Sequence, residues 1–355
     1  MPTRTLPLSL AIFMATSALT QAVWANTEPT VRTPAAAAGT PISVRKTQQM
    51  EFVSKVNGHR YSISVALPFE AAPAEGYGVL YVLDGYAYFG SATEIARSFG
   101  NTPGTVVVVG IGYPEDPAYT KKVLEERGPV PAYFANLPPW RSAPMLERNY
   151  DLTLPATDAE LEAQRLPGPG TPKQKSTNFG GVDAFLKTIE TEIKPRVEAL
   201  AHIDRTNQAL FGHSYGGLAT LHALFVEPNA FRTFIVASPS IWYNNRAVLA
   251  DEPKFAAAVR SGQAQPRVLV TMGGDEDVAV KFPKEWGIDE AGAKAYYQKV
   301  RMVENGRELV TRLQALHGGP GYLVESYAVF DKESHAAAPW SALARGVPFA
   351  FSRLP

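Results

Sequence analysis

Hydrophobic and polar positions follow one another along the chain in a pattern that predicts strands and helices in turn. Two nearly continuous apolar stretches, GVLYVLD (78–84) and TVVVVGIGY (105–113), are typical of strands buried on both faces of a sheet. Further short stretches of this kind are NQALFG, FRTFIVAS, RVLVTMG and YLVESYAVF. Segments with helical spacing of apolar residues separate them, among them VDAFLKTIETEIKPRVEAL, which Pro195 is expected to bend, and residues 289–316. This alternation predicts an α/β fold with a mostly parallel central sheet and helices on both faces.

The globular pattern begins near residue 46 with an expected antiparallel hairpin. The segment MEFVSKVNGHRYSISVALP contains two strand-like stretches around Asn57-Gly58, a dipeptide that favours a tight turn. The chain has no internal repeat and no second apolar core, so residues 46–355 are expected to form one domain. Within it, residues 114–172 are rich in proline and aromatic residues and then in glycine. Such an insertion either folds over a pocket as a lid or decorates the surface.

Residues 1–25 have the composition of a secretory signal peptide. Arg4 precedes a short apolar stretch. The small residues Val23 and Ala25 occupy the −3 and −1 positions of a signal-peptidase cleavage site after Ala25. The apolar stretch is too short to span a bilayer. Residues 26–45 are polar and alanine-rich without periodicity, which predicts a flexible tether. We therefore expect an exported, periplasmic protein with no stable membrane insertion after signal cleavage.

The composition excludes several classes of partner and chemistry. Lys and Arg number 34 and Asp and Glu number 34, so no net charge attracts nucleic acid. Cysteine is absent, which removes disulfides, thiolate metal sites and cysteine nucleophiles. The chain has no H-E-x-x-H motif, EF-hand loop or histidine cluster, so neither a metal nor another cofactor is expected, and iron could enter only with a substrate. The partner expected is a small-molecule ester, and nothing in the sequence indicates an oligomeric state.

Ser214 is the strongest candidate for a catalytic residue. The sequence Gly212-His213-Ser214-Tyr215-Gly216 follows an expected strand and opens an expected helix. In this context G-x-S-x-G predicts a nucleophile elbow, a turn so tight that the neighbours of the serine must lack bulk. At the start of a helix, the serine oxygen and a developing anion are stabilised by the helix dipole.

An elbow serine needs a base, and in this architecture the histidine follows the nucleophile and the acid in the chain. His213 is expected to point away from the serine, and His222 lies on the packing face of the same helix. Of the later histidines, His317 has the position of a helix end, whereas His335 follows the last expected strand in the loop DKESHAAAPW. We therefore expect His335 to be the base.

The acid of a triad is expected after the strand RVLVTMG, in the segment GDED. Asp275, Glu276 and Asp277 all lie there, and the spacing after the strand favours Asp277. A buried carboxylate at this point would hold the imidazole in the productive tautomer. A neighbouring acid, a solvated turn or a Ser–His pair without an acid remain alternatives.

Acyl transfer also requires donors for the oxyanion. One is the backbone N–H of Tyr215, directly after the nucleophile. The second is expected from the loop after the strand GVLYVLD, where a backbone N–H of Gly85 or Tyr86 could face the pocket. An ordinary turn at the end of the strand is the alternative.

Seven segments of the chain carry a family resemblance: YVLDGYAYF, IGYP, RNYDLT, NFGGVDAFLKTIETEIKPRVE, FGHSYGG, ASPSIW and ESH. In this order they resemble the putative esterase family of α/β-hydrolases, and most of all its siderophore esterases, which act on enterobactin and salmochelin trilactones or on bacillibactin. The resemblance covers most of residues 45–350. It implies an α/β-hydrolase fold and ester hydrolysis with Ser214 as nucleophile and His335 as base. Because the acid is sometimes displaced in that branch, the resemblance does not choose among the carboxylates, and residues 114–148 depart from the branch, which leaves the substrate open.

Two further side chains are candidates for substrate binding. Trp242, in SPSIW after an expected strand, could stack on an aromatic ring of the substrate or simply fill space under the insertion. Arg148, in RNYDLT, could bind a carboxylate or phenolate, but a local salt bridge with Asp151 is the simpler interpretation.

Together these features predict an exported serine hydrolase that cleaves carboxylic esters through an acyl-enzyme. A siderophore trilactone is the leading substrate class. A general carboxylesterase or acyltransferase of the same fold, and a catalytically silent ligand-binding member, are the alternatives.

Overall fold

The computed structural model describes residues 42–98, 105–128, 139–278, 282, 284–325 and 327–352, without the side chains of residues 139–142. The predicted signal peptide (1–25) and the predicted tether up to residue 41 lie outside the described residues. From Val44 onwards the chain forms one compact unit. Within the described residues, no helix is both long and apolar enough to cross a membrane.

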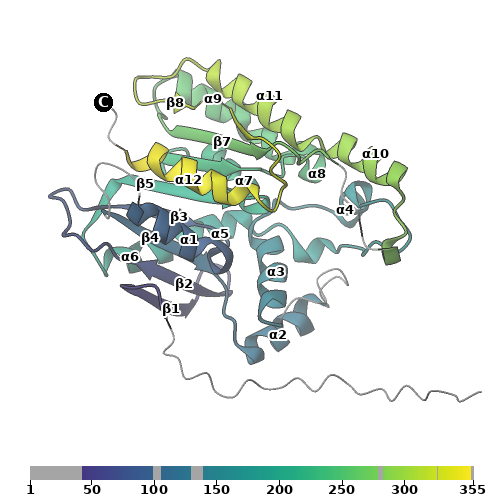
Figure 1. Cartoon of the computed structure of the whole chain (residues 1–355), viewed down its shortest axis with the longest axis horizontal. Helices are drawn as coiled ribbons and strands as arrows, with labels where there is room; N and C mark the ends of the chain where they lie inside the picture. Colours follow the sequence, from purple (N-terminus) through teal and green to yellow (C-terminus); the bar gives the residue numbers. More distant parts are fainter. Residues whose placement is uncertain are drawn as a thin grey trace, which may run out of the picture. The chain divides into compact units, whose positions relative to one another are not determined.

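A nine-stranded sheet runs through the described part of this unit (Figure 1). Its strands are β1 (Thr47–Val53), β2 (Arg60–Ala66), β3 (Tyr77–Val82), β4 (Val106–Gly112), β5 (Ile203–His213), β6 (Thr233–Ala237), β7 (Arg267–Gly273), β8 (Leu323–Val324) and β9 (Ala328–Phe330). The order is β1-β2-β4-β3-β5-β6-β7-β8, and β9 also pairs with β7. Strands β3 to β9 run parallel, whereas β1 and β2 form the expected hairpin, with Gly58 at φ 75° in its turn.

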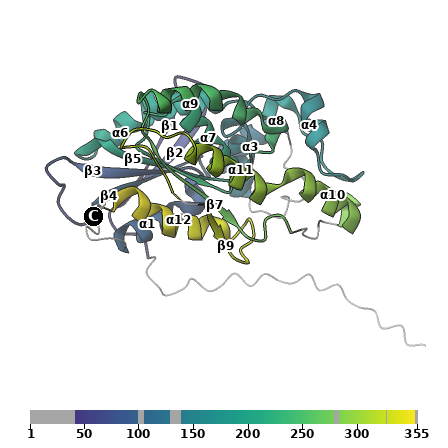
Figure 2. The same cartoon turned by 90° about the horizontal axis from the view of Figure 1, so that it is seen from above.

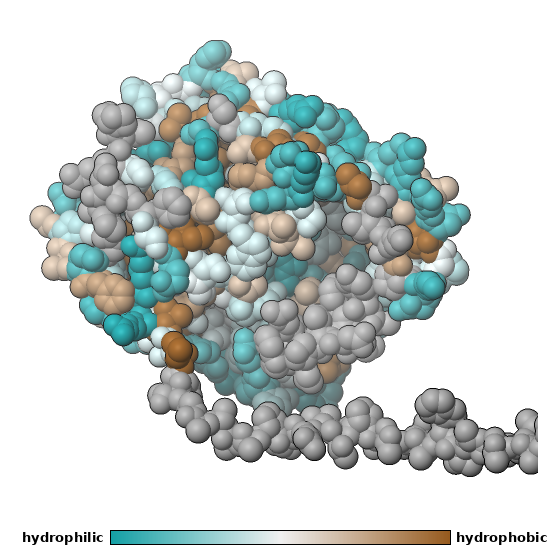
Figure 3. All heavy atoms as spheres, viewed as in Figure 1, coloured by the Kyte–Doolittle hydropathy of each residue, from teal (hydrophilic) through white to brown (hydrophobic). Residues whose placement is uncertain are grey.

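Helices cover both faces of the sheet, as the alternating pattern predicted (Figure 2). The main helices of the layers are α1 (Gly85–Ser98), α5 (Val182–Thr188), α6 (Lys194–Glu198), α7 (Tyr215–Val226), α9 (Glu252–Arg260), α10 (Glu290–Val300), α11 (Met302–Gln314) and α12 (Ala338–Phe351). One core cluster joins α1 and α12 to one face of the sheet, and a larger cluster joins α5, α6, α7, α9 and α11 to the other. On the side seen in Figure 3, hydrophilic and hydrophobic residues are interspersed.

The insertion at residues 114–172 is richer in helix than its proline and glycine content suggested. It contains α2 (Pro117–Arg127), α3 (Pro139–Asp151) and α4 (Asp158–Gln164). Local capping explains two of these helices: the Asp116 carboxylate accepts a hydrogen bond from the N–H of Tyr119, and Thr157 and Glu160 form a capping box at the start of α4. Residues 129–138 lie outside the described residues. Whether the insertion moves as a lid stays a prediction.

Two expected helices are interrupted. In VDAFLKTIETEIKPRVEAL the helix passes through a π-helical turn, Ile189–Ile193, which ends two residues before Pro195. Proline has no N–H to donate, so the ladder of hydrogen bonds is rearranged at the point where a bend was predicted. The stretch 289–316 is divided into α10 and α11 by Arg301, which adopts a left-handed conformation with φ 48°.

Candidate active site

Polar residues from five strand ends meet at the carboxyl edge of the parallel sheet. Asp84 follows β3, Ser214 follows β5, Ser238 follows β6, Glu276 follows β7 and His335 follows β9. These strands are neighbours in the sheet, so loops distant in sequence are brought to one place. This edge is where open α/β sheets bind their ligands.

Ser214 occupies a strained turn between β5 and α7, as the G-x-S-x-G pattern predicted. Its backbone has φ 60° and ψ −118°, a conformation that is costly for a residue with a side chain. A Cβ at Gly212 would lie 2.1 Å from the carbonyl oxygen of Gly216, and one at Gly217 would lie 2.5 Å from that of Ala237. The glycines are therefore required by close backbone contacts, and the turn presents Ser214 at the start of a helix.

The carboxylate that contacts His335 belongs to Glu276, not to the predicted Asp277. His335 Nδ1 lies 2.8 Å from Glu276 Oε2. The carboxylate of Asp277 instead accepts a hydrogen bond from the N–H of Val303 near the start of α11, and burial raises the pKa of this group. Asp275 is exposed. The spacing after the strand predicted the acid one residue too late in the chain, because the turn after β7 directs the side chain of Glu276 back towards the sheet.

Glu276 is built into the sheet edge by three donors. Its Oε1 accepts from the N–H of Gly273 at 2.6 Å and from the hydroxyl of Ser238 at 2.5 Å, while Oε2 faces His335. The side chain of Glu276 has no exposed surface, whereas 42% of the His335 side chain is exposed. A fixed carboxylate thus holds Nδ1 of a ring that is open to the pocket, which orients the imidazole and selects its tautomer.

His213 supports the other side of the His335 ring, a contact that the sequence analysis missed. The two ring centroids are 4.5 Å apart. His213 is buried, its Nδ1 lies 3.1 Å from the Tyr88 hydroxyl, and burial followed by the proximity of His335 holds its pKa well below the usual value. His213 is therefore a neutral packing partner of His335. The G-H-S tripeptide was the only signal for it in the sequence.

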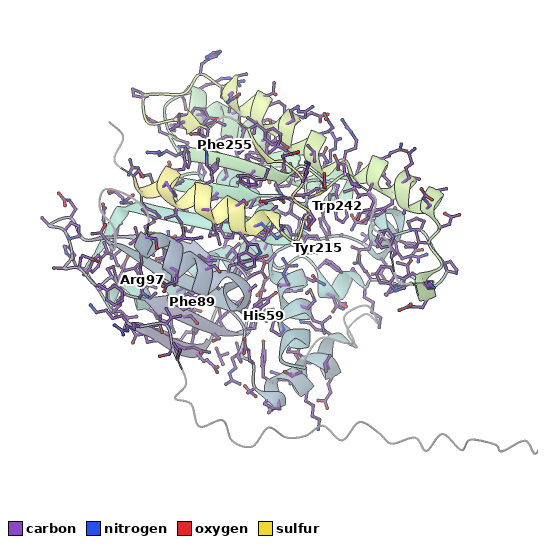
Figure 4. All side chains as sticks on the ribbon, in the orientation of Figure 1. His59, Phe89, Arg97, Tyr215, Trp242 and Phe255 are labelled. Carbon is purple, nitrogen blue, oxygen red and sulfur yellow. The ribbon has the colours of Figure 1, made fainter. Side chains whose placement is uncertain are left out.

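Ser214 and His335 line one pocket of about 300 Å³. Aromatic side chains form part of its wall: the Trp242 ring lies 6.4 Å from the rings of both Tyr215 and Tyr296. Figure 4 shows Tyr215 and Trp242 next to each other at this edge of the sheet. Trp242 thus lies where it can contact a substrate, while it also packs against its neighbours. Tyr296, from α10, was not singled out from the sequence.

Both predicted oxyanion donors lie in the first turn of a helix. Tyr215 is the first residue of α7, and α1 begins at Gly85, directly before Tyr86. Helices begin with N–H groups that have no intrahelical acceptor, which suits them to an anion. A Cβ at Gly85 would lie 2.5 Å from the backbone of Gly110, so β4 fixes the path of this loop. The Gly85–Tyr86 segment, expected in a loop after the strand, is the first turn of this helix.

Arg148 pairs with Asp84 and not with Asp151, and its role in substrate binding stays a prediction. Its guanidinium makes two hydrogen bonds, of 2.7 and 2.9 Å, to the carboxylate of Asp84. The Asp84 charge raises the pKa of Arg148 against the opposing effect of burial. Arg148 thus braces the residue that precedes the Gly85–Tyr86 turn. Asp151 is buried elsewhere, against Tyr61, Tyr113 and His59.

One cluster in the described part of the chain has the ligand types of a metal site: His59, Glu147 and Asp151. Arg127 already pairs with one of its two carboxylates, because its guanidinium contacts both Glu147 oxygens at 3.2 Å, and it lies 3.1 Å from His59 Nε2. A bound cation would face this fixed positive charge. The cluster joins the hairpin to the insertion helices (His59 in Figure 4) and does not contribute to the pocket of Ser214.

Comparisons with known proteins agree with this arrangement. Residues 150–314 match the Esterase family model, described as "Putative esterase". Ferri-bacillibactin esterase BesA of Bacillus subtilis is 30% identical over 308 residues, which are 85% of this chain and 89% of that protein. Siderophore enterobactin esterase of Emericella nidulans is 32% identical over 321 residues, 87% of this chain and 95% of that protein.

A solved structure, siderophore hydrolase EstA from Aspergillus nidulans, has a TM-score of 0.66 at 28% identity, covering 88% of this chain and 97% of that one. The agreement extends over almost the full length of these proteins. The chain therefore has the α/β-hydrolase fold, belongs to the esterase family in the branch of the siderophore esterases, and is a carboxylic ester hydrolase.

Proposed function

We propose that the chain is an exported serine esterase that cleaves siderophore esters through an acyl-enzyme on Ser214. The observation that carries the mechanism is the hydrogen bond between His335 and the buried Glu276, in the pocket that Ser214 lines. The substrate class is supported by the relatives, which are named siderophore esterases and hydrolases.

The reaction follows from the roles of these groups. With Nδ1–H donated to Glu276, Nε2 of His335 carries a lone pair and removes the proton of Ser214 as its oxygen attacks the ester carbonyl. Backbone N–H groups of Tyr215 and of the Gly85–Tyr86 turn stabilise the oxyanion. His335 then protonates the leaving alcohol, and water repeats the sequence on the acyl-enzyme.

Hydrolysis of p-nitrophenyl acetate and butyrate tests the role of Ser214. Ser214→Ala is expected to lower kcat by about 10³-fold or more. Ser240 lines the same pocket and contacts the elbow through its backbone N–H, which donates to the Ser214 carbonyl and is kept by alanine, so Ser240→Ala is the matched control and is expected to stay active. A fluorophosphonate should label the wild-type protein at Ser214 and leave Ser214→Ala unlabelled. Equal activity of Ser214→Ala and wild type would refute the mechanism.

The substrate class requires a separate test with catecholate trilactones, supplied with and without ferric iron. Mass spectrometry of the products should show linear hydrolysed esters, and addition of an acceptor alcohol separates hydrolysis from acyl transfer. Turnover of p-nitrophenyl esters without turnover of any trilactone would favour the general carboxylesterase. Binding without turnover would favour a ligand-binding protein.

Export is proposed from residues 1–25. Cell fractionation of the full chain should find the protein in the periplasm, with Ala25 removed together with the preceding residues, and deletion of residues 1–25 should leave it in the cytoplasm. An uncleaved N-terminus would contradict this part of the proposal.

A further inference from the structure

A second pocket adjoins the one that holds Ser214 and His335. It has a volume of about 370 Å³ and shares Trp242, Tyr296 and Val300 with the first pocket. The far wall comes from α4 of the insertion and from the segment α8 (Tyr243–Arg246). We call this second cavity the distal pocket. Because the two cavities share a wall, a molecule with its ester at Ser214 can extend into the distal pocket.

Hydrogen-bond donors dominate the polar lining of the distal pocket. Lys299 donates to the carbonyl oxygen of Ala163 at 2.6 Å, and no carboxylate among the described residues pairs with it. Arg246 lies 3.5 Å from Glu308, whose other oxygen is bound more closely, at 2.7 Å, by Arg301. One carboxylate is thus shared by two guanidinium groups, so the positive charge of Arg246 is only partly compensated.

The amide of Gln164 adds a donor without a partner. Its Oε1 accepts from the N–H of Asn244 at 2.7 Å, which fixes the orientation of the amide. Its Nε2 is buried and has no hydrogen-bond partner among the described residues. A buried N–H without an acceptor destabilises the protein, and an acceptor atom on a ligand would remove this penalty. Glu160, the carboxylate in the lining, is already bound by Thr157 in the capping box of α4.

The backbone of the same wall is strained. Asn244, Asn245 and Arg246 have φ of 45°, 51° and 64°. Three successive left-handed residues with side chains are costly, and such strain gathers where a site requires a particular shape. Hydrogen bonds from Asn244 to Gln164 and to the carbonyl oxygen of Pro155 hold the turn against α4.

We propose that the distal pocket is a substrate subsite, which binds a second arm of the substrate through acceptor oxygen atoms. The inference rests on the proposed esterase reaction and adds the chemistry of the part of the substrate that lies away from the cleaved bond. Gln164 and Lys299 donate to those oxygens, Arg246 supplies positive charge, and Trp242 and Tyr296 form the passage between the pockets. Substrates with a single short acyl group leave the subsite empty.

Matched p-nitrophenyl esters test this inference. Acyl chains of graded length end in a carboxylate, a primary amide or a methyl group, and a second series carries the same ends on the alcohol side. At a length that reaches the distal pocket, wild type is expected to have about tenfold lower KM for the carboxylate and amide ends than for the methyl end. A preference for the carboxylate over the amide would identify charge as the recognised property, and equal preference would identify the acceptor oxygen.

Two substitutions probe the subsite, with a control on the same helix. Lys299→Met and Gln164→Leu are expected to abolish the preference, and Lys299→Arg should retain it. Lys294→Met, an exposed lysine of α10 that does not line the pocket, should behave as wild type. Thermal melts verify that the variants fold. The inference is overturned if wild type shows no preference at any length in either series, or if the preference survives both substitutions. Loss of acetate hydrolysis in Ser214→Ala reports on the reaction itself and is independent of either result.

Discussion

At the residue scale, the neighbours Glu276 and Asp277 are expected to differ sharply in their effect on activity. Glu276→Gln keeps the size of the side chain but replaces the carboxylate at His335 Nδ1 by an amide that can present a donor there. The imidazole then loses its productive tautomer, and kcat is expected to fall by about 10²- to 10⁴-fold. Steady-state hydrolysis of p-nitrophenyl butyrate measures the change.

The matched control is Asp277→Asn. Asp277 binds the N–H of Val303, which an amide oxygen accepts equally well, so kcat is expected to remain close to that of wild type. If Asp277→Asn were the more damaging substitution, Glu276 would be a structural residue and the acid would be reassigned.

His213 is expected to be a positioning residue for His335. His213→Leu removes the ring that packs against His335 and is expected to lower kcat by about tenfold, because small displacements of catalytic groups reduce rates strongly. The KM for a small ester should stay unchanged, since His213 does not line the pocket. Tyr88→Phe, which removes only the hydroxyl near His213 Nδ1, should have a weaker effect. A change confined to protein stability, with kcat intact, would exclude the positioning role.

These single residues also show what the sequence could predict. Within the Gly–x–Ser–x–Gly motif, Gly212 has no room for a Cβ, and a Cβ at Gly216 would lie 3.3 Å from Asp84 Oδ2, so the spacing reflects the packing of the turn and Ser214 was predictable. His335 was predictable as the base, because in this architecture the catalytic histidine follows the nucleophile and the acid in the chain. The choice among three successive carboxylates was not predictable, because it depends on how the turn after β7 directs each side chain. The contact between His213 and His335 joins residues more than a hundred positions apart and has no local pattern.

At the scale of elements, the pair Arg148–Asp84 fixes α3 of the insertion to the end of β3. Both side chains are largely buried, with 11% and 4% of their surface exposed. Arg148→Met leaves Asp84 buried without its partner, which is expected to lower the free energy of unfolding by about 3–5 kcal/mol. Activity should also fall, because Asp84 precedes the Gly85–Tyr86 turn. Urea denaturation and ester hydrolysis of the same preparation measure both effects.

A bidentate pair on the surface provides the comparison. Arg205 binds both oxygens of Glu198 but is exposed, so Arg205→Met is expected to change stability little. If Arg148→Met lowered the free energy of unfolding as little as Arg205→Met, burial would not make the stability of the protein more dependent on the Arg148–Asp84 pair.

Element boundaries were the least predictable part of the fold. The apolar spacing of residues 289–316 is consistent with one long helix, yet the helix is interrupted at Arg301. No glycine or proline at that position predicts the interruption. The final expected strand is divided into β8 and β9, both paired with β7. Periodicity reports which face is buried but not where the hydrogen-bond ladder is interrupted.

At the scale of the whole molecule, the sheet and its layers were predictable because strands buried on both faces need continuous apolar sequence. The insertion at 114–172 was not. Its helices depend on caps and on buried charges such as Glu147 and Asp151, whose partners Arg127 and His59 come from separate segments. Composition alone therefore indicated a loop where the structure has α2, α3 and α4.

The same charges predict a pH dependence of folding stability. Burial lowers the pKa of His59, and the charge of Arg127 lowers it further. The hydrogen bond to Asp151 and the negative charges of Asp151 and Glu147 raise it by more, so the pKa lies above 6.5. A raised pKa means that protonated His59 favours the folded state. Its stabilising contribution is fully present below the unfolded pKa of 6.5 and is lost as the pH rises through the folded value.

His59→Gln should therefore cost more stability in mildly acidic than in alkaline solution. Urea denaturation of wild type and variant at about pH 5.5 and about pH 8.5 measures this difference, which should shrink at the higher pH. His202→Gln, which changes a histidine outside the cluster, corrects for general effects of pH. A cost that is the same at both pH values would instead mean that His59 stays neutral, donating from Nδ1 to Asp151 and accepting from Arg127 at Nε2, as the 3.1 Å contact to the guanidinium permits. In that case the hairpin and the insertion are joined by a hydrogen-bonded chain whose strength does not depend on protonation of His59.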